Sequence, residues 1–174
     1  MPNRIVIRPA RGPTDLEAVV ALCNEFLDWC RRRYGANSWM VDRYYSPEKW
    51  TAVLADLSRM HQPPEGEILL AHLDERPVGC VMMQRMDAKA CEMKRLFVRD
   101  EGRGVGVGRK LCRELMRTAA ERGYSTMRLD TGLPHDEALA LYESLGFRRR
   151  EPYYDAPTEL RHHLVFMEAQ LISN

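Results

Sequence analysis

The stretch GRGVGVGRKL at residues 102–111 constrains this chain more than any other feature. Glycine stands at every second position from 102 to 108, basic side chains lie among the glycines, and an amphipathic helical pattern follows at once. Glycine permits left-handed backbone and close approach of other groups to the main chain. Free N–H groups at the start of a helix, together with the helix dipole, attract anions. The stretch therefore predicts a main chain wrapped closely around an anionic ligand.

Length and charge limit the classes of protein that the chain can form. With 174 residues, we expect one domain over residues 1–174. The 26 basic and 25 acidic side chains nearly balance, so we do not expect binding to nucleic acid. No apolar run is long enough to cross a membrane, and the segment MPNRIVIRPA lacks the apolar region of a signal peptide. We therefore expect a cytoplasmic protein without membrane contact, whose five cysteines, lacking metal-like spacing, lie in the core.

Hydrophobic periodicity and turn residues predict a mixed α/β order. Strands are expected at 4–8, 67–73, 78–85, 90–98, 126–131, 147–150 and 164–169. Helices are expected from a capping box of Thr14 and Glu17 to Gly35, from Ser46-Pro47 to QPPEG at 62–66, from the glycine stretch to about residue 122, and over 136–145. The three strands between 67 and 98 should pair antiparallel through tight turns. The strands at 90–98 and 126–131 flank a helix and should be parallel neighbours.

Two familiar phosphate-binding loops fit the glycine stretch poorly. A Walker loop ends in Gly-Lys-Ser/Thr, but Lys110 follows Arg109 and precedes Leu111. A dinucleotide fingerprint requires G-x-G-x-x-G, whereas the glycines here are spaced two apart. Asp130 ends the next expected strand, where a ribose-binding acid would lie, so a nicotinamide-dinucleotide enzyme stays open as an alternative. We favour interpreting Asp130 as a strand-end carboxylate.

Two segments resemble the GNAT family of N-acetyltransferases. Arg103-x-x-Gly106-x-Gly108 is similar to the family's R/Q-x-x-G-x-G/A motif. ALALYESLGF at 138–147 is similar to its A-x-x-L-Y-x-x-x-G-F segment, and a helix and a strand separate the two motifs in the family's order. The resemblance implies a mixed, mostly antiparallel central sheet with one parallel β-α-β unit and helices on both faces.

The resemblance also implies acetyl-CoA as the acetyl donor. The main chain of the glycine loop would hold the pyrophosphate, with Val105 and Val107 anchoring the loop on the core and Arg103 and Arg109 contacting phosphate. The pantetheine arm would pair with the end of the strand at 90–98 as an added strand. The expected coenzyme-binding residues are therefore Leu96, Phe97, Val98, Arg103, Gly104, Val105, Gly106, Val107, Gly108 and Arg109.

Direct acetyl transfer to an amine needs a base for the amine and an acid for the departing thiolate. By the resemblance, Tyr142 in the L-Y-x-x-x-G-F segment is the expected general acid. Glu92 is the candidate base by the same resemblance, and period-2 alternation would place it on one face with Lys94, Leu96 and Val98. A surface carboxylate paired with a neighbouring basic residue is an equally weighted interpretation of Glu92. A main-chain N–H near Val98 would stabilise the oxyanion.

The histidines carry less information than the glycine loop. The family often has Asn where His135 stands, ahead of the alanine-rich helix, and a turn histidine is the favoured interpretation here. The other histidines lack the spacing of ligands, so we expect no metal.

The sequence leaves the acceptor amine open. In this fold it would lie between residues 31–45 and 151–163, two segments rich in Tyr and Arg with scattered acids. This mixture fits a polyamine-like cation and an amine that also bears a carboxylate equally well, on a small molecule or a peptide. The family further suggests a homodimer. The alternative to an N-acetyltransferase is a non-catalytic acyl-CoA-binding or regulatory domain.

Overall fold

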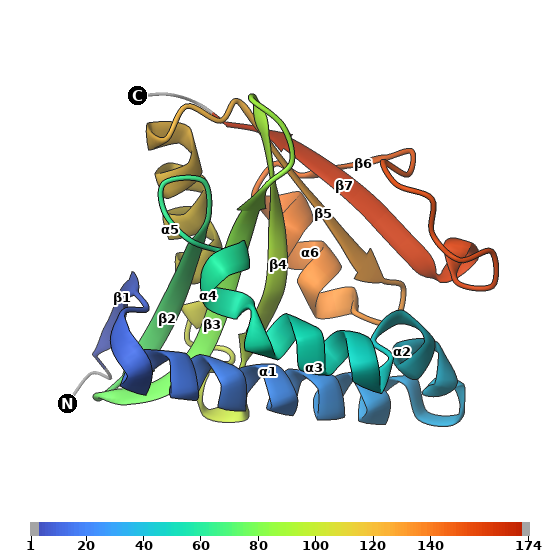
Figure 1. Cartoon of the computed structure of the whole chain (residues 1–174), viewed down its shortest axis with the longest axis horizontal. Coiled ribbons are helices and arrows are strands. Elements are labelled where there is room, and N and C mark those ends of the chain that lie inside the picture. The colour runs from blue at the N-terminus through green and yellow to red at the C-terminus, as the bar shows by residue number, and fades with distance from the viewer. Residues whose placement is uncertain (1–3, 172–174) are drawn as a thin grey trace.

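The computed structural model describes residues 4–171 and contains a seven-stranded sheet in the order β1-β2-β3-β4-β5-β7-β6 (Figure 1). Neighbouring strands run antiparallel, except for the parallel pair β4 and β5. The strands are β1 (Ile5–Pro9), β2 (Glu67–Leu73), β3 (Arg76–Arg85), β4 (Ala90–Val98), β5 (Thr126–Gly132), β6 (Arg148–Arg150) and β7 (Leu164–Gln170). The mixed, mostly antiparallel sheet with one parallel unit is confirmed.

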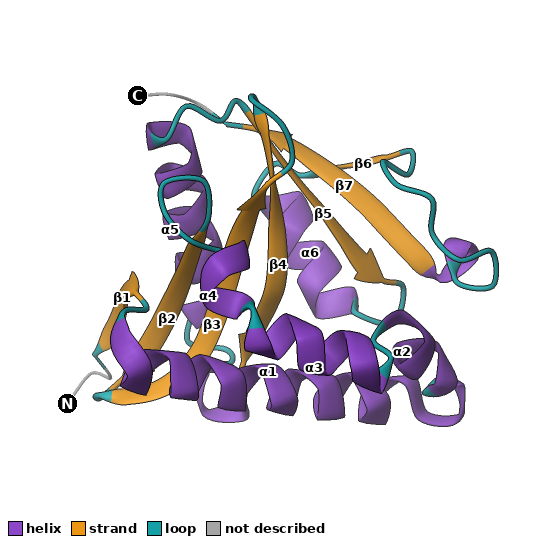
Figure 2. Ribbon diagram, in the orientation of Figure 1, coloured by secondary structure: helices purple, strands orange, loops and turns teal. Residues whose placement is uncertain are grey.

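Helices cover both faces of this sheet (Figure 2). They are α1 (Gly12–Tyr34), α2 (Trp39–Tyr44), α3 (Pro47–Ala55), α4 (Leu57–Met60), α5 (Val107–Glu121) and α6 (Asp136–Ser144), with 3-10 turns at Gly35–Asn37, Asp100–Gly102 and Arg161–His163. The buried side chains form two cores, one between the sheet and α1–α4 and the other between the sheet, α5 and α6. Within residues 4–171, no helix has both the length and the apolarity that a membrane crossing requires.

Most element bounds agree with the sequence analysis. The strands at 67–73 and 90–98 lie at the predicted residues. Gly35, Gly123 and Gly146 have positive φ at or just after the ends of α1, α5 and α6, which is the conformation that makes glycine a frequent helix terminator. All five cysteines are buried and free, as expected for core residues.

The start of α1 differs from the prediction. The capping box of Thr14 and Glu17 is wrong, because the helix already begins at Gly12. The carboxylate of Asp15 accepts the main-chain N–H of Arg11 at 2.8 Å instead. The short helix α2 was not predicted at all, since its six residues are too few to display helical periodicity.

A β-bulge at Arg95 interrupts β4. The register with β3 shifts there, so that Arg95 and Leu96 together oppose the single residue Val81. Arg95 has φ 52°, in the left-handed region that non-glycine residues rarely adopt. After the bulge, the side chains of β4 therefore alternate between the two faces of the sheet in the opposite order.

The alternation predicted along β4 fails at this bulge. Glu92 and Lys94 point toward the α1 face, because the residues next to them belong to the core beneath α5. Leu96 and Val98 pack against that α5 core and so lie on the opposite face from Glu92. The prediction that all four share one face is wrong.

β4 and β5 separate soon after they pair. Their parallel register covers Ala90–Glu92 and Thr126–Arg128, and no further pairs follow. From Met93 to Val98, the main chain of β4 therefore has an unpaired edge on the β5 side. Figure 1 shows the two strands diverging toward α6.

Candidate active site

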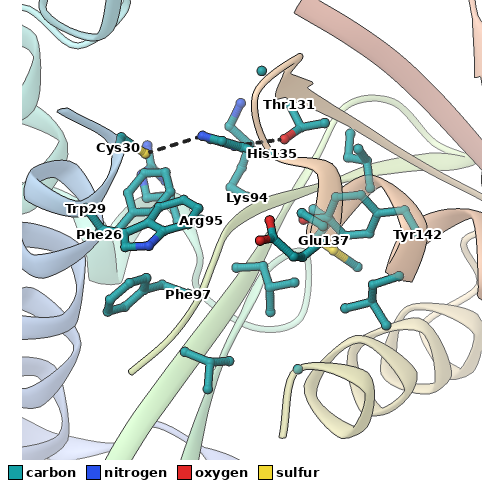
Figure 3. A pocket seen from close by; sticks show the side chains of 18 of the residues that line it. Phe26, Trp29, Cys30, Lys94, Arg95, Phe97, Thr131, His135, Glu137 and Tyr142 are labelled. Carbon is teal, nitrogen blue, oxygen red and sulfur yellow. Dashed lines mark hydrogen bonds between the residues drawn. The ribbon is translucent and has the colours of Figure 1, made fainter. Parts of the chain in front are cut away.

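A cavity of about 510 Å³ lies where β4 and β5 diverge (Figure 3). It is bounded by α1, α2, β4, the glycine loop, the end of β5 and the start of α6. Every expected coenzyme-binding residue except Val105 lines it, and so does Tyr142, whereas Glu92 does not. The structure thus brings together the two motifs that are far apart in the sequence.

The glycine loop forms the N-terminal end of α5. Gly106 is the N-cap residue with φ 90°, and Gly104 has φ 73°. None of the main-chain N–H groups from 104 to 109 donates to another described residue. Val107 is fully buried, but Val105 is 46% exposed, so the expectation that Val105 anchors the loop is wrong. The loop presents a row of free donors at the positive end of a helix, which suits a pyrophosphate.

Two arginines stand beside these donors. Arg103 Nε donates to the carbonyl of Val98 at 2.9 Å, and its guanidinium lies 5.0 Å from the ring centre of Trp29. Arg109 Nη2 donates to Ser144 Oγ at 2.8 Å. Both side chains bring positive charge to the same end of the cavity as the loop, which favours an anionic ligand there.

Tyr142 enters the cavity from α6 (Figure 3). The residue is 7% exposed, and its ring packs on Phe147 with 5.8 Å between ring centres. Burial raises the pKa of the Tyr142 phenol well above its usual value, and the nearby Cys112 and Asp130 raise it further. The phenol is therefore protonated at neutral pH and can donate a proton.

Glu92 is buried beside the cavity and fully engaged. Its Oε1 accepts from the hydroxyl of Tyr153 at 2.8 Å and pairs with Lys94 Nζ at 3.2 Å. Its Oε2 accepts from Gln84 Nε2 at 2.9 Å. A proton leaving an amine in the cavity would have to pass through one of these partners to reach Glu92.

Asp130 faces the cavity from the end of β5. Its Oδ2 accepts from the hydroxyls of Tyr44 at 2.7 Å and Tyr154 at 3.0 Å, and its Oδ1 pairs with Lys94 Nζ at 3.3 Å. The side chain is 5% exposed, so Asp130 is a buried group of the cavity wall. Sequence reasoning gave it no place in the transferase site. The Tyr-rich segments at 31–45 and 151–163, which supply both tyrosines, were the available signal.

His135 is likewise part of the cavity wall rather than a surface turn residue. Its Nδ1 lies 3.2 Å from Thr131 Oγ1 and its Nε2 lies 4.0 Å from Cys30 Sγ (Figure 3). Its ring lies between Trp29 and Tyr34, at 5.1 and 5.7 Å between ring centres. Desolvation by burial lowers the pKa of His135 to about 4, so the imidazole is neutral at physiological pH.

The site is thus a cavity between a splayed parallel strand pair, with a loop of free main-chain N–H groups at one end and a buried tyrosine beside it. The model of the acetyltransferase (GNAT) family matches residues 23–147. The chain belongs to the GNAT family and is an N-acetyltransferase.

Similar proteins agree with this family. An uncharacterized N-acetyltransferase of Schizosaccharomyces pombe is 34% identical over 173 residues, covering 98% of this chain and 97% of that protein. N-acetyltransferase 8 of Homo sapiens is 32% identical over 102 residues, which cover 55% of this chain and 45% of that protein. A crystal structure of an acetyltransferase from Streptococcus agalactiae has the same fold, with a TM-score of 0.72 at 20% identity, over 96% of this chain and 98% of that one.

The fold also bears on the nicotinamide alternative. The dinucleotide fingerprint belongs to folds with an open, mostly parallel sheet. The sheet of this protein is mostly antiparallel, and β4 and β5 are its parallel pair. The carboxylate of Asp130 already accepts from two tyrosine hydroxyls and pairs with Lys94. Neither observation favours a dinucleotide.

Proposed function

We propose that the protein transfers the acetyl group of acetyl-CoA directly to an amine while both substrates are bound. The observation that carries this proposal is the continuity of one cavity, which joins the free N–H groups of the glycine loop, the unpaired edge of β4 and the phenol of Tyr142. The loop suits a pyrophosphate, and the strand edge suits the two amides of a pantetheine arm. Solved structures of the same fold, from Thermoplasma acidophilum and Elizabethkingia anophelis, contain coenzyme A or acetyl-CoA.

The roles of the side chains follow from this placement. The thiolate that leaves the acetyl group needs a proton, and Tyr142 can supply it because its phenol stays protonated in the cavity. The oxyanion that forms on the acetyl carbonyl would be stabilised by a main-chain N–H on the free edge of β4 near Val98. The neutral thiol then departs as coenzyme A.

Glu92 remains the proposed base, and it would receive the proton of the amine through one of its hydrogen-bonded partners. Lys94 contacts both Glu92 and Asp130, so a charge change at either carboxylate is felt by the other. The variant Glu92→Gln should change the pH dependence of kcat/KM if Glu92 receives the proton. Glu121→Gln makes the same change at an exposed carboxylate of α5 that has no contact with Glu92, and it should leave that profile unchanged.

Relatives suggest that the acceptor is a small amine-bearing molecule. Among them are an N-acetylaspartate synthetase of Danio rerio, 36% identical over 98 residues, and an IAA acetyltransferase of Azospirillum brasilense, 32% identical over 101 residues. These alignments cover 55% and 58% of this chain. The acceptor side of the cavity, lined by aromatic side chains of α1 and α2, fits a compact molecule.

Calorimetry with acetyl-CoA and NADH tests the proposal first. We expect acetyl-CoA to bind with micromolar affinity, roughly −8 kcal/mol, and NADH not to bind. Release of coenzyme A in the presence of amines then separates an enzyme from a non-catalytic binding domain. Preference for NADH would overturn the assignment of the loop, and binding without any turnover across a broad amine panel would favour the non-catalytic domain.

A further inference from the structure

We propose that Arg95 binds a carboxylate of the acceptor, so that the acceptor is an amine that also carries a carboxylate group. This inference rests on the proposed function. It selects between the two acceptor classes that the composition of the surrounding segments leaves open. Arg95 is among the side chains that line the cavity (Figure 3).

One nitrogen of the Arg95 guanidinium is held in place. Nη1 lies 3.3 Å from His61 Nε2 and 3.5 Å from Met82 Sδ. His61 is 1% exposed, and its Nδ1 lies 2.9 Å from the carbonyl of Met83. Because that carbonyl can only accept, Nδ1 carries the proton and Nε2 accepts from Arg95. The indole of Trp50 lies 6.0 Å from the guanidinium carbon and completes the support.

The other edge of the same guanidinium has no partner. Neither Nε nor Nη2 donates to any side chain or carbonyl in residues 4–171, and Nε is buried. Arginine stays charged in proteins, so this edge is permanently cationic. Nε has almost no accessible surface, so Nη2 is the one of the two donors that a ligand in the cavity can reach. Nη2 is therefore the charged donor from which one oxygen of a carboxylate would accept.

The backbone of Arg95 also has an unfavourable conformation. Its left-handed φ of 52° is unfavourable for a side chain, and the bulge that holds it is what turns Arg95 to the cavity face beside Lys94. Regular alternation after Lys94 would instead have sent Arg95 into the core beneath α5. The bulge thus directs the Arg95 side chain to the cavity face, where Nη2 of its guanidinium has no partner among the described residues.

The other cations of the cavity are already committed. Lys94 contacts the carboxylates of Glu92 and Asp130, at 3.2 and 3.3 Å. Arg103 and Arg109 stand at the glycine loop. Among the described cavity residues, Arg95 is therefore the cation available to an acceptor carboxylate.

Matched pairs of acceptors test this inference. Phenylalanine and 2-phenylethylamine differ by one carboxylate, as do leucine and 3-methylbutylamine, and release of coenzyme A reports kcat/KM for each. In the wild-type protein, we expect the amino acid of the better pair to exceed its amine at least about tenfold. Arg95→Met should reduce that ratio to near one, and Arg95→Lys, which keeps the charge but not the planar guanidinium, should give an intermediate ratio. Arg117→Met, on the exposed face of α5, is the matched control.

Several outcomes would overturn the inference. Equal or better use of the amines by the wild-type protein would exclude a carboxylate site, while leaving the proposed acetyl transfer intact. A ratio that survives in Arg95→Met would place the carboxylate elsewhere. If no member of the panel is acetylated, or if the variant does not fold, thermal unfolding of the wild-type protein decides: 3-phenylpropionate should raise Tm more than 3-phenylpropanamide does, and equal shifts would contradict the proposal. Failure to bind acetyl-CoA would instead contradict the proposed function.

Discussion

Tyr142 is the side chain whose chemistry depends most directly on burial. Because its phenol is buried and its pKa is raised, Tyr142 stays protonated in the cavity and can give that proton to the leaving thiolate. We predict that Tyr142→Phe lowers kcat at least about tenfold and leaves the affinity for acetyl-CoA unchanged, since the ring and its packing on Phe147 are kept. Steady-state rates and calorimetry measure the two quantities. Unchanged turnover would remove Tyr142 from the mechanism.

His61 makes the stability of the fold depend on pH. Desolvation by burial lowers the pKa of His61 to about 4 from its usual 6.5. As pH falls below about 6.5, the unfolded chain takes up a proton at this histidine before the folded one does. The free energy of unfolding should therefore fall by about 3 kcal/mol between pH 6.5 and 4 from His61 alone.

Urea denaturation at several pH values checks this prediction. The loss of stability on acidification should be smaller in His61→Gln, because glutamine does not titrate in this range. His162→Gln is the control, since that residue is exposed. Parallel pH profiles for the wild-type protein and His61→Gln would contradict the buried, neutral state of His61.

Among the secondary-structure elements, the N-terminal turn of α5 decides whether a phosphate can be held. A Cβ at Gly106 would meet no atom within 4 Å, but the backbone there has φ 90°. We predict that Gly106→Val weakens acetyl-CoA binding at least about tenfold, because the strained loop no longer aligns its N–H groups, at a cost in stability of about 2 kcal/mol. Gly123→Val is the matched control, because Gly123 also has a positive φ, 89°, and open space around its Cβ but lies after the other end of α5. Calorimetry of both variants measures the effect.

The elements themselves were largely predictable from hydrophobic period and turn residues. The strands at 67–73 and 90–98 and the helix ends at Gly35, Gly123 and Gly146 follow from local sequence alone. The bulge at Arg95 was missed, although CEMKRLFV alternates apolar and polar residues only as far as Lys94, and the second consecutive polar residue is Arg95. The break in the pattern marks the position, but the left-handed backbone there depends on the register with β3.

The candidate site was predictable where a motif named it. The glycine loop and Tyr142 belong to the two quoted motifs, and both line the cavity. Asp130 and Arg95 lie in no motif, and His135 stands where the family has Asn. The positions of these side chains depend on contacts between segments that are far apart, such as Asp130 with Tyr44 on α2. Such contacts follow from the assembled fold and not from spacing along the chain.

Across the whole molecule, one buried carboxylate joins three segments. Glu67 on β2 is 1% exposed and accepts from Arg11 ahead of α1, at 2.7 Å, and from Arg122 after α5, at 2.5 Å. We predict that Glu67→Gln lowers the free energy of unfolding by about 3 kcal/mol, because it leaves two arginines without their anion. Glu114→Gln, which breaks a solvent-exposed pair with Arg117, should cost less than about 1 kcal/mol. Chemical denaturation distinguishes the two, and similar losses would argue against a structural role for Glu67.

The outermost strand, β6, has consequences for how copies of this protein meet. It consists of three arginines and forms one edge of the open sheet. Unpaired strand edges are templates for aggregation, and short, charged edges oppose it. A second copy adding antiparallel to β6 would bring arginine against arginine, so continuous sheet growth through this edge is electrostatically disfavoured. High ionic strength, which screens this repulsion, is therefore the condition under which edge-to-edge association through β6 should first appear.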